Sequence, residues 1–194
     1  MRCISVIFTI LILLSGCSGK QPLELVRSSV EISDDRSGGI GITSGEKEGE
    51  YIQPITLSYQ FVLKNIGEEI LGGNEKLNNE TFEYEDGIKV YIEPNEKLRE
   101  ISKDVMGFNI YSESERKEAK MGSGKQSIPI LQPNQEGEYY LDFDLGASEE
   151  NPEIRLAPPQ EQLDRLMTYA QEASLVIYIE NEEIARFDLS QNKE

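Results

Sequence analysis

Residues 55–63 read ITLSYQFVL, and this stretch decides the fold class. Large apolar residues occupy every second position from Ile55 to Leu63, and mostly polar residues fall between them. A period of two sustained over such a length predicts a β-strand with one buried face. Residues 138–145, EYYLDFDL, repeat the alternation with Tyr139 and Leu145 at the two ends of the apolar row. Two such strands favour a sheet that covers a core on one side.

The rest of the chain adds short elements separated by polar turns. Further strands, and a hairpin near the end of the chain, are expected at 23–32, 40–42, 88–92, 108–111, 128–131, 175–180 and 184–189. Apolar residues at helical spacing predict helices at 96–105, between a capping Asn95 and Gly107, and at 160–173, beginning near Pro159. Charged or Pro-containing stretches are expected to be loops at 112–125 and 146–159.

About eight short strands with one or two short helices indicate a mainly β chain, folded as an antiparallel β-sandwich. No repeat and no sharp change of composition divides the sequence. We therefore expect one domain over residues 23–190, followed by a disordered tail at 191–194.

Composition excludes several kinds of catalyst. The chain has 194 residues, with 19 Lys+Arg, 36 Asp+Glu, a net charge of −17, two Cys, no His and no Trp. Ser-His-Asp triads, Cys-His dyads, His-ligated metals and Cys-rich zinc sites need residues that are missing. The acidity also argues against nucleic acid, whose phosphates are bound by Lys and Arg. We expect a protein that is not an enzyme.

The N-terminal residues have the pattern of a targeting signal. Arg2 precedes an apolar run from Ile4 to Leu14, which is too short for the ~20 residues that span a bilayer but fits a signal peptide. The run ends in Leu14-Ser15-Gly16-Cys17, which resembles the lipobox of bacterial lipoproteins.

The lipobox resemblance implies a lipid anchor. In that family a diacylglycerol is joined to the Cys thiol, here Cys17, and cleavage falls between Gly16 and Cys17. Residues 1–16 would then be the signal peptide and 17–22 the lipidated N-terminus and tether. The expected location is the extracytoplasmic face of the cell membrane, because acyl chains hold a protein on a bilayer. The alternatives are an ordinary secretory signal or an uncleaved anchor.

Two short sequence segments refine the prediction of the fold. Residues 64–69 (KNIGEE) follow a strand and 131–138 (LQPNQEGE) precede one. They resemble the corresponding stretches of immunoglobulin-like domains in uncharacterised Gram-positive surface lipoproteins. The resemblance implies an immunoglobulin-like sandwich, although the helix at 160–173 and the missing Cys…Trp…Cys core depart from antibody domains.

Two acidic residues could hold a metal ion. Asp142 and Asp144 lie two apart on one strand, so their carboxylates face the same way. With Glu149 and Glu150 from the next loop they could supply oxygen ligands to Ca²⁺. The competing interpretation is a solvated polar face opposite a buried one.

A basic patch interrupts the acidic chain. Its members, within ten positions, are Arg116, Lys117, Lys120 and Lys125. Such a patch could dock lipid headgroups or an anionic wall polymer. Glu115 and Glu118 lie among these residues, and the alternative is a mobile charged loop.

Together these features predict a lipid-anchored, non-catalytic interaction module of the cell envelope. Its expected partners are the membrane, through the anchor, and another envelope protein, but not nucleic acid. Apart from the diacylglycerol no cofactor is expected. The alternative function is a ligand-capture lipoprotein for Ca²⁺ or a small polar solute, which would need a concave site.

Overall fold

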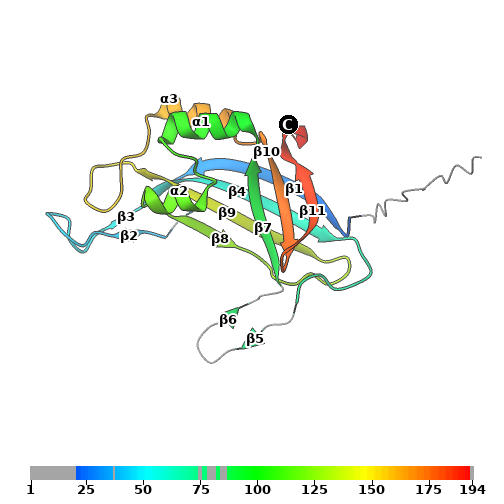
Figure 1. Ribbon diagram of the computed structural model, residues 1–194. Helices are drawn as coiled ribbons and strands as arrows, with labels where there is room; N and C mark the ends of the chain where they lie inside the picture. Colours follow the sequence, from blue (N-terminus) through cyan, green and yellow to red (C-terminus); the bar gives the residue numbers. More distant parts are fainter. Residues whose placement is uncertain (1–20, 37, 74–75, 78–81, 84–86, 193–194) are drawn as a thin grey trace, which may run out of the picture.

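The predicted strand at 55–63 is the centre of the larger sheet. The computed structural model describes residues 21–36, 38–73, 76–77, 82–83 and 87–192 (Figure 1). Its four-stranded sheet has the antiparallel order β1-β4-β9-β8. The bounds are β1 (Leu23–Ser33), β4 (Pro54–Asn65), β9 (Glu136–Ala147) and β8 (Ser123–Gln126). The apolar row of β4 is buried from Leu57 to Leu63 and partly buried at Ile55, as the alternation predicts.

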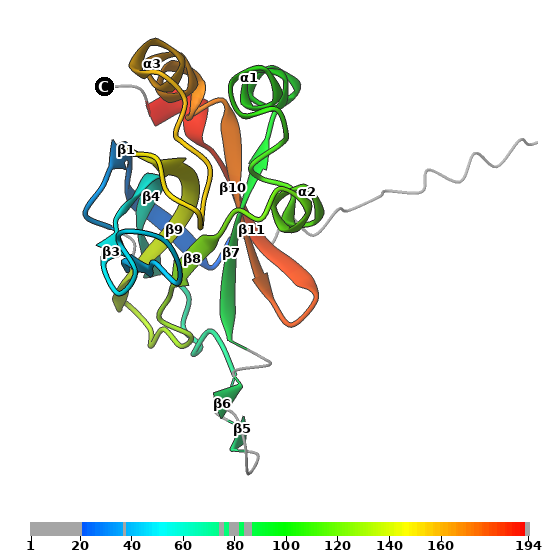
Figure 2. The same cartoon turned by 90° about the vertical axis from the view of Figure 1, so that its left-hand side faces the viewer.

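A three-stranded antiparallel sheet faces the first. Its order is β11 (Glu182–Asp188), β10 (Ala173–Ile179) and β7 (Ile88–Pro94). Figure 2 shows the two sheets as separate layers, and one apolar cluster contains inner residues of both, including Leu57 of β4 and Ile177 of β10. Burial of the two apolar faces against each other explains why the sheets pack together. The prediction of a mainly β, antiparallel sandwich with short helices is confirmed.

Two helices lie side by side along one edge of the sandwich (Figure 1). In α1 (Glu96–Met106), the Asn95 side chain accepts the N–H of Leu98 and Gly107 ends the helix at φ 81°. Both caps are those predicted. The second, α3 (Gln160–Tyr169), stops short of the predicted 173 because Ala173 already begins β10. Each buries apolar residues, with Leu98 and Leu166 both at 0% exposure.

Two predicted strands are wrong. Residues 108–111 form turns, because Ser102 Oγ accepts the N–H of Ile110 and donates to the Phe108 carbonyl. These backbone groups are thereby satisfied without a neighbouring strand. Residues 128–131 contribute only an isolated bridge from Leu131 to Leu71.

The predicted loop at 112–125 is also wrong. It contains the short helix α2 (Glu113–Glu118) and the edge strand β8. Ser112 begins the helix by accepting the N–H of Glu115. The expected loop at 146–159 is correct from residue 148 onward, because Gly146 and Ala147 still belong to β9, in which Gly146 has φ 127°. A Cβ there would lie 2.6 Å from the Ala157 nitrogen, so this position requires glycine.

Small elements complete the chain. Two short hairpins and a 3₁₀ turn are β2 (Ile40–Gly41) with β3 (Tyr51–Ile52), β5 (Lys76–Leu77) with β6 (Phe82–Glu83), and η1 (Leu189–Asn192). The turn runs two residues into the segment 191–194, where the sequence predicts disorder, because Gln191 donates to Asp188. Residues 1–20, with the signal peptide and Cys17, lie outside the described residues. Over the described part of the chain, no helix is long and apolar enough to cross a membrane.

Candidate functional site

The outer face of the three-stranded sheet carries a hollow of about 620 Å³. Strand alternation places it there: Ile88, Val90 and Ile92 of β7 point into the core, so Lys89 and Tyr91 point outward. We call this hollow the tyrosine groove. The residues of it used below are Lys89, Tyr91, Arg99, Tyr111, Tyr178 and Glu180.

The rings of the tyrosine groove are held by one another. Tyr91 and Tyr178 meet edge to face, with centroids 5.7 Å apart. Tyr91 remains 41% exposed, so part of its surface is free to contact a ligand. Tyr111 shares a 2.7 Å hydrogen bond with the buried Tyr59 hydroxyl, and burial raises the pKa of Tyr111 well above its usual value. Its phenol therefore stays neutral and fixed in position.

A second hollow, of about 450 Å³, lies between α2 and β8. We call it the arginine hollow, and it is lined by Glu113, Arg116, Lys117, Met121, Ser123 and Lys125. Lys125 joins the two hollows because its Nζ lies 4.3 Å from the centre of the Tyr91 ring. This arrangement is a cation–π contact between β8 and β7.

Arg116 is the most buried charged side chain of the arginine hollow, with 8% exposure. Its Nη1 donates to the Ile110 carbonyl at 2.6 Å and its Nη2 to Ser123 Oγ at 3.2 Å. The guanidinium also lies 5.3 Å from the centre of the Phe143 ring. Arg116 thus connects α2 to β8 and to β9. Both of its hydrogen-bond acceptors, the Ile110 carbonyl and the Ser123 hydroxyl, are neutral. The pKa of Arg116 is lowered, and burial is the main cause.

The structure brings together three of the four residues of the predicted basic patch. Arg116, Lys117 and Lys125 surround the arginine hollow, but Lys120 is exposed and does not line it. The interpretation as a mobile charged loop is wrong for this stretch, since it forms α2 and β8.

The sequence did not identify Lys89 and Arg99, the two cations that line the tyrosine groove. Lys89 and Tyr91 could have been found, because they occupy the outward positions of the predicted strand 88–92. Arg99 gave no sequence signal, because only the fold brings α1 beside β7.

The charge of the two hollows is opposite to that of the chain. Their lining includes five Lys or Arg and three Glu, whereas the whole sequence has 19 Lys+Arg and 36 Asp+Glu. Glu113 already pairs with Lys117, and Glu93 with Arg186. Among the described residues no ion pair involves Lys89, Arg99 or Lys125. The pKa of Lys125 is lowered, first by burial and then by the positive charge of Arg116.

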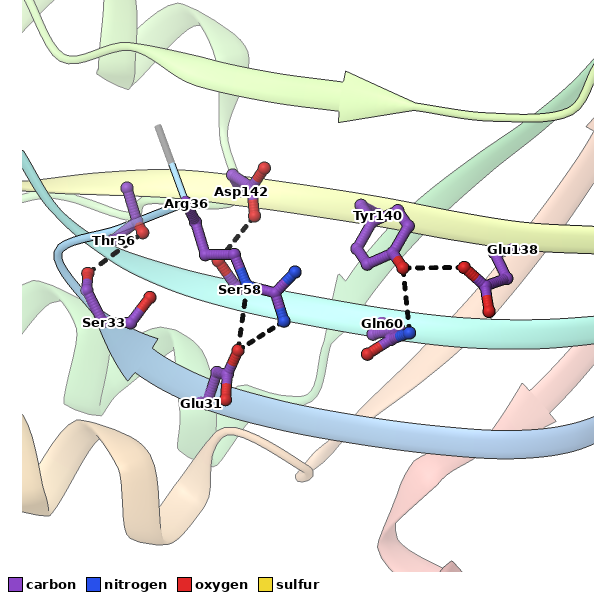
Figure 3. A network of polar contacts seen from close by, with 9 residues as sticks. All are labelled: Glu31, Ser33, Arg36, Thr56, Ser58, Gln60, Glu138, Tyr140 and Asp142. Atoms are coloured by element: carbon purple, nitrogen blue, oxygen red, sulfur yellow. Dashed lines mark hydrogen bonds and ion pairs between the residues drawn. The ribbon is translucent and has the colours of Figure 1, made fainter. Parts of the chain in front are cut away.

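The predicted metal ligands Asp142 and Asp144 lie on the outer face of the four-stranded sheet, where Figure 3 shows Asp142. Asp142 and Asp144 share that face, as predicted, opposite Ser58 and Thr56 of β4. Ser58 Oγ donates to Asp142 at 2.5 Å, and Glu149 pairs with Lys47 at 2.7 Å. In the described part of the chain, no three Asp, Glu, His or Cys side chains converge to hold a metal ion.

The same outer face is covered by a polar network. Arg36 donates twice to Glu31 and lies 5.5 Å from the centre of the Tyr140 ring. Figure 3 shows Arg36 reaching across the sheet toward Glu31, with the Ser58–Asp142 hydrogen bond beside it. Tyr140 donates to Glu138 and accepts from Gln60. These contacts connect polar side chains to one another across the face.

The tyrosine groove and the arginine hollow together define a class of site: an open, cation- and tyrosine-lined surface on an antiparallel β-sandwich. Tyrosine offers an apolar ring and a hydroxyl, and unpaired ammonium and guanidinium groups attract anions. Comparison of the chain with protein-family models, with curated proteins and with solved structures finds no match.

Proposed function

We propose that the chain is a lipid-anchored, extracytoplasmic lipoprotein whose immunoglobulin-like sandwich is a non-catalytic interaction module of the cell envelope. The lipobox ending at Cys17 supports the anchor. The observation that carries the binding role is the tyrosine groove, where Tyr91 and Tyr178 meet on an outer sheet face beside cations that have no ion pair among the described residues. The partner we expect is another envelope protein.

A protein partner fits the chemistry of the groove. Tyrosine and arginine are enriched where proteins bind each other, since both combine a large contact area with polar groups. The groove presents Tyr91, Tyr178 and Arg99 on an open face. A partner with acidic side chains would also pair with Lys89.

One observation favours a second candidate function, capture of a small polar solute. The volume of the groove, about 620 Å³, falls in the range of small-molecule sites. Polar groups from β7, β10 and α1 converge on it. For Ca²⁺ capture the described residues offer no comparable cluster of carboxylates.

The anchor predicts a loss of membrane attachment in Cys17→Ala. A chain without acyl groups lacks the ~0.8 kcal/mol per buried CH₂ that holds a lipoprotein on a bilayer. We expect the native protein in the membrane fraction, with an intact mass that shows cleavage before Cys17 and added lipid. The variant should be unlipidated, and either released or unprocessed. A native protein that is free of lipid, or that begins elsewhere, would contradict the anchor.

The binding role predicts that the double variant Tyr91→Ala/Tyr178→Ala loses its partner. Each ring contributes apolar contact and a hydroxyl, so crosslinking in intact cells should fall about tenfold or more. The matched control is Tyr51→Ala, which removes a 75% exposed tyrosine from β3, outside the groove. Crosslinked complexes that persist at native yield in the double variant would show that the groove does not bind the protein partner.

A further inference from the structure

The arginine hollow contains a buried cation, Arg116, whose hydrogen bonds go to neutral acceptors. Arg116 is 8% exposed, and its guanidinium donates to the carbonyl of Ile110 and the hydroxyl of Ser123. Burying a cation is costly, so such a group commonly has anionic groups close to it. Other hydrogen-bonding positions of the guanidinium fork remain, since Arg carries five N–H donors.

Further cations surround the hollow. Lys117 and Lys125 line it, and Lys89 is close enough that its charge lowers the pKa of Lys125. Two carboxylates offset part of this charge: Glu113, which is held by Lys117 at its Nζ, and Asp144, which acts on Arg116. Four cations against two carboxylates leave a net positive site in a chain of charge −17.

We propose that the arginine hollow is a binding site for a phosphate group. Two excess positive charges match a phosphate better than a single carboxylate. The guanidinium of Arg116 matches phosphate geometry through paired N–H donors, and the ammonium of Lys125 adds a point charge. Ser123 accepts from Arg116, so its own hydroxyl proton is free to donate to a phosphate oxygen.

The structure gives the site a fixed frame. The Arg116 guanidinium is held by Ile110, Ser123 and the Phe143 ring, so little order has to be gained on binding. The open hollow of about 450 Å³ exceeds the space that a phosphate needs, so the group can belong to a larger ester. Its source is either a free phosphate compound or a lipid headgroup. This site does not depend on what binds the tyrosine groove.

The test is titration of the purified native protein with inorganic phosphate at constant ionic strength. Saturable binding is expected, and Lys125→Ala should weaken it about tenfold, because it removes one charge-assisted hydrogen bond. The matched control is Lys97→Ala, which removes another lysine stacked on a tyrosine ring, 5.3 Å from the centre of Tyr169. Lys125 is chosen because Arg116 also supports the fold, and a variant there could lose binding through unfolding.

A second readout follows the ammonium group itself. A bound anion beside Lys125 favours its charged form, so NMR titration should show its pKa rising when phosphate is added. Acetate at the same concentration should give a much smaller effect. Absence of saturable phosphate binding, equal binding in Lys125→Ala and Lys97→Ala, or equal binding of acetate would each overturn the proposal.

A third experiment identifies the source of the phosphate group. Vesicles containing phosphatidylglycerol are added to the phosphate-bound protein, with phosphatidylcholine vesicles alongside. Displacement of phosphate by the anionic vesicles alone assigns the site to a lipid headgroup, and retention of phosphate assigns it to a free phosphate compound. Both outcomes support a phosphate site. Because only purified protein is used, a failure here leaves the anchor and the protein partner of the tyrosine groove untouched.

Discussion

Replacing Tyr59 with alanine is expected to lower the free energy of unfolding by about 3–5 kcal/mol, the usual cost of deleting a buried aromatic ring. Tyr59 is 1% exposed at the centre of β4. Its ring lies 6.1 Å from both Phe61 and Phe143, centre to centre. Its hydroxyl donates to the Ala170 carbonyl at 2.7 Å. The substitution therefore opens a cavity and leaves a buried acceptor without its donor.

Two variants separate these effects in urea unfolding. Tyr59→Phe keeps the ring and removes only the hydroxyl, so it should cost about 1–3 kcal/mol, the penalty of an unsatisfied buried group. Tyr51→Ala removes a tyrosine that is 75% exposed and should change stability by about 0.5 kcal/mol or less. If Tyr59→Ala cost no more than Tyr51→Ala, the aromatic cluster would not be the centre of the core.

Tyr59 also connects the core to the tyrosine groove. Its hydroxyl meets that of Tyr111 at 2.7 Å, and Tyr111 lines the groove. The same hydroxyl reaches Ala170, just beyond the end of α3. One inward residue of the central strand thus fixes both the segment after α1 and the end of α3. The groove is held by the sandwich rather than by a free loop.

The strands that could be predicted are those whose pattern has one cause. Along residues 55–63 and 138–145, burial of one face alone sets the alternation, so the sequence displays it directly. The caps Asn95 and Gly107 could be recognised for a similar reason, since each acts within one turn of the helix.

The elements that could not be predicted depend on contacts distant in sequence. Phe108 and Ile110 are buried and apolar, as in a strand, yet Ser102 takes their backbone hydrogen bonds. Strand β8 is exposed along its length and exists because it pairs with β9. Its sequence, SGKQ, has no apolar alternation that could reveal it.

The residues of the candidate site likewise divide into those that the sequence could reveal and those that only the fold brings together. Arg116, Lys117 and Lys125 lie close in sequence, so composition alone suggested a patch. That Arg116 is buried while Lys117 is exposed follows from the packing of α2 on Phe143, which no local pattern shows. Lys89 on β7 and Arg99 on α1 belong to the site only because the fold brings these two elements together.

Alkaline pH is expected to unfold the protein through its buried tyrosines. Burial raises the pKa of Tyr59 and of Tyr139 well above the ordinary value. In the unfolded chain both ionise near pH ~10. Below that pH both states hold the protons and the stabilisation is fully present. Above it the unfolded state releases protons that the native state keeps, so stability falls by about 1.4 kcal/mol per pH unit for each tyrosine.

Two fully buried tyrosines therefore predict a loss of about 3 kcal/mol between pH ~9 and pH ~11, and Tyr111 adds to it in the same direction. Urea midpoints over this range measure the loss. Other groups titrate there too, so Tyr139→Phe provides the comparison. It forfeits the 2.8 Å hydrogen bond to the Ile128 carbonyl and starts less stable, yet its further loss with pH should be smaller by about 1.4 kcal/mol. Parallel curves for the native protein and Tyr139→Phe would mean that Tyr139 ionises alike in both states, which its burial at 0% exposure opposes.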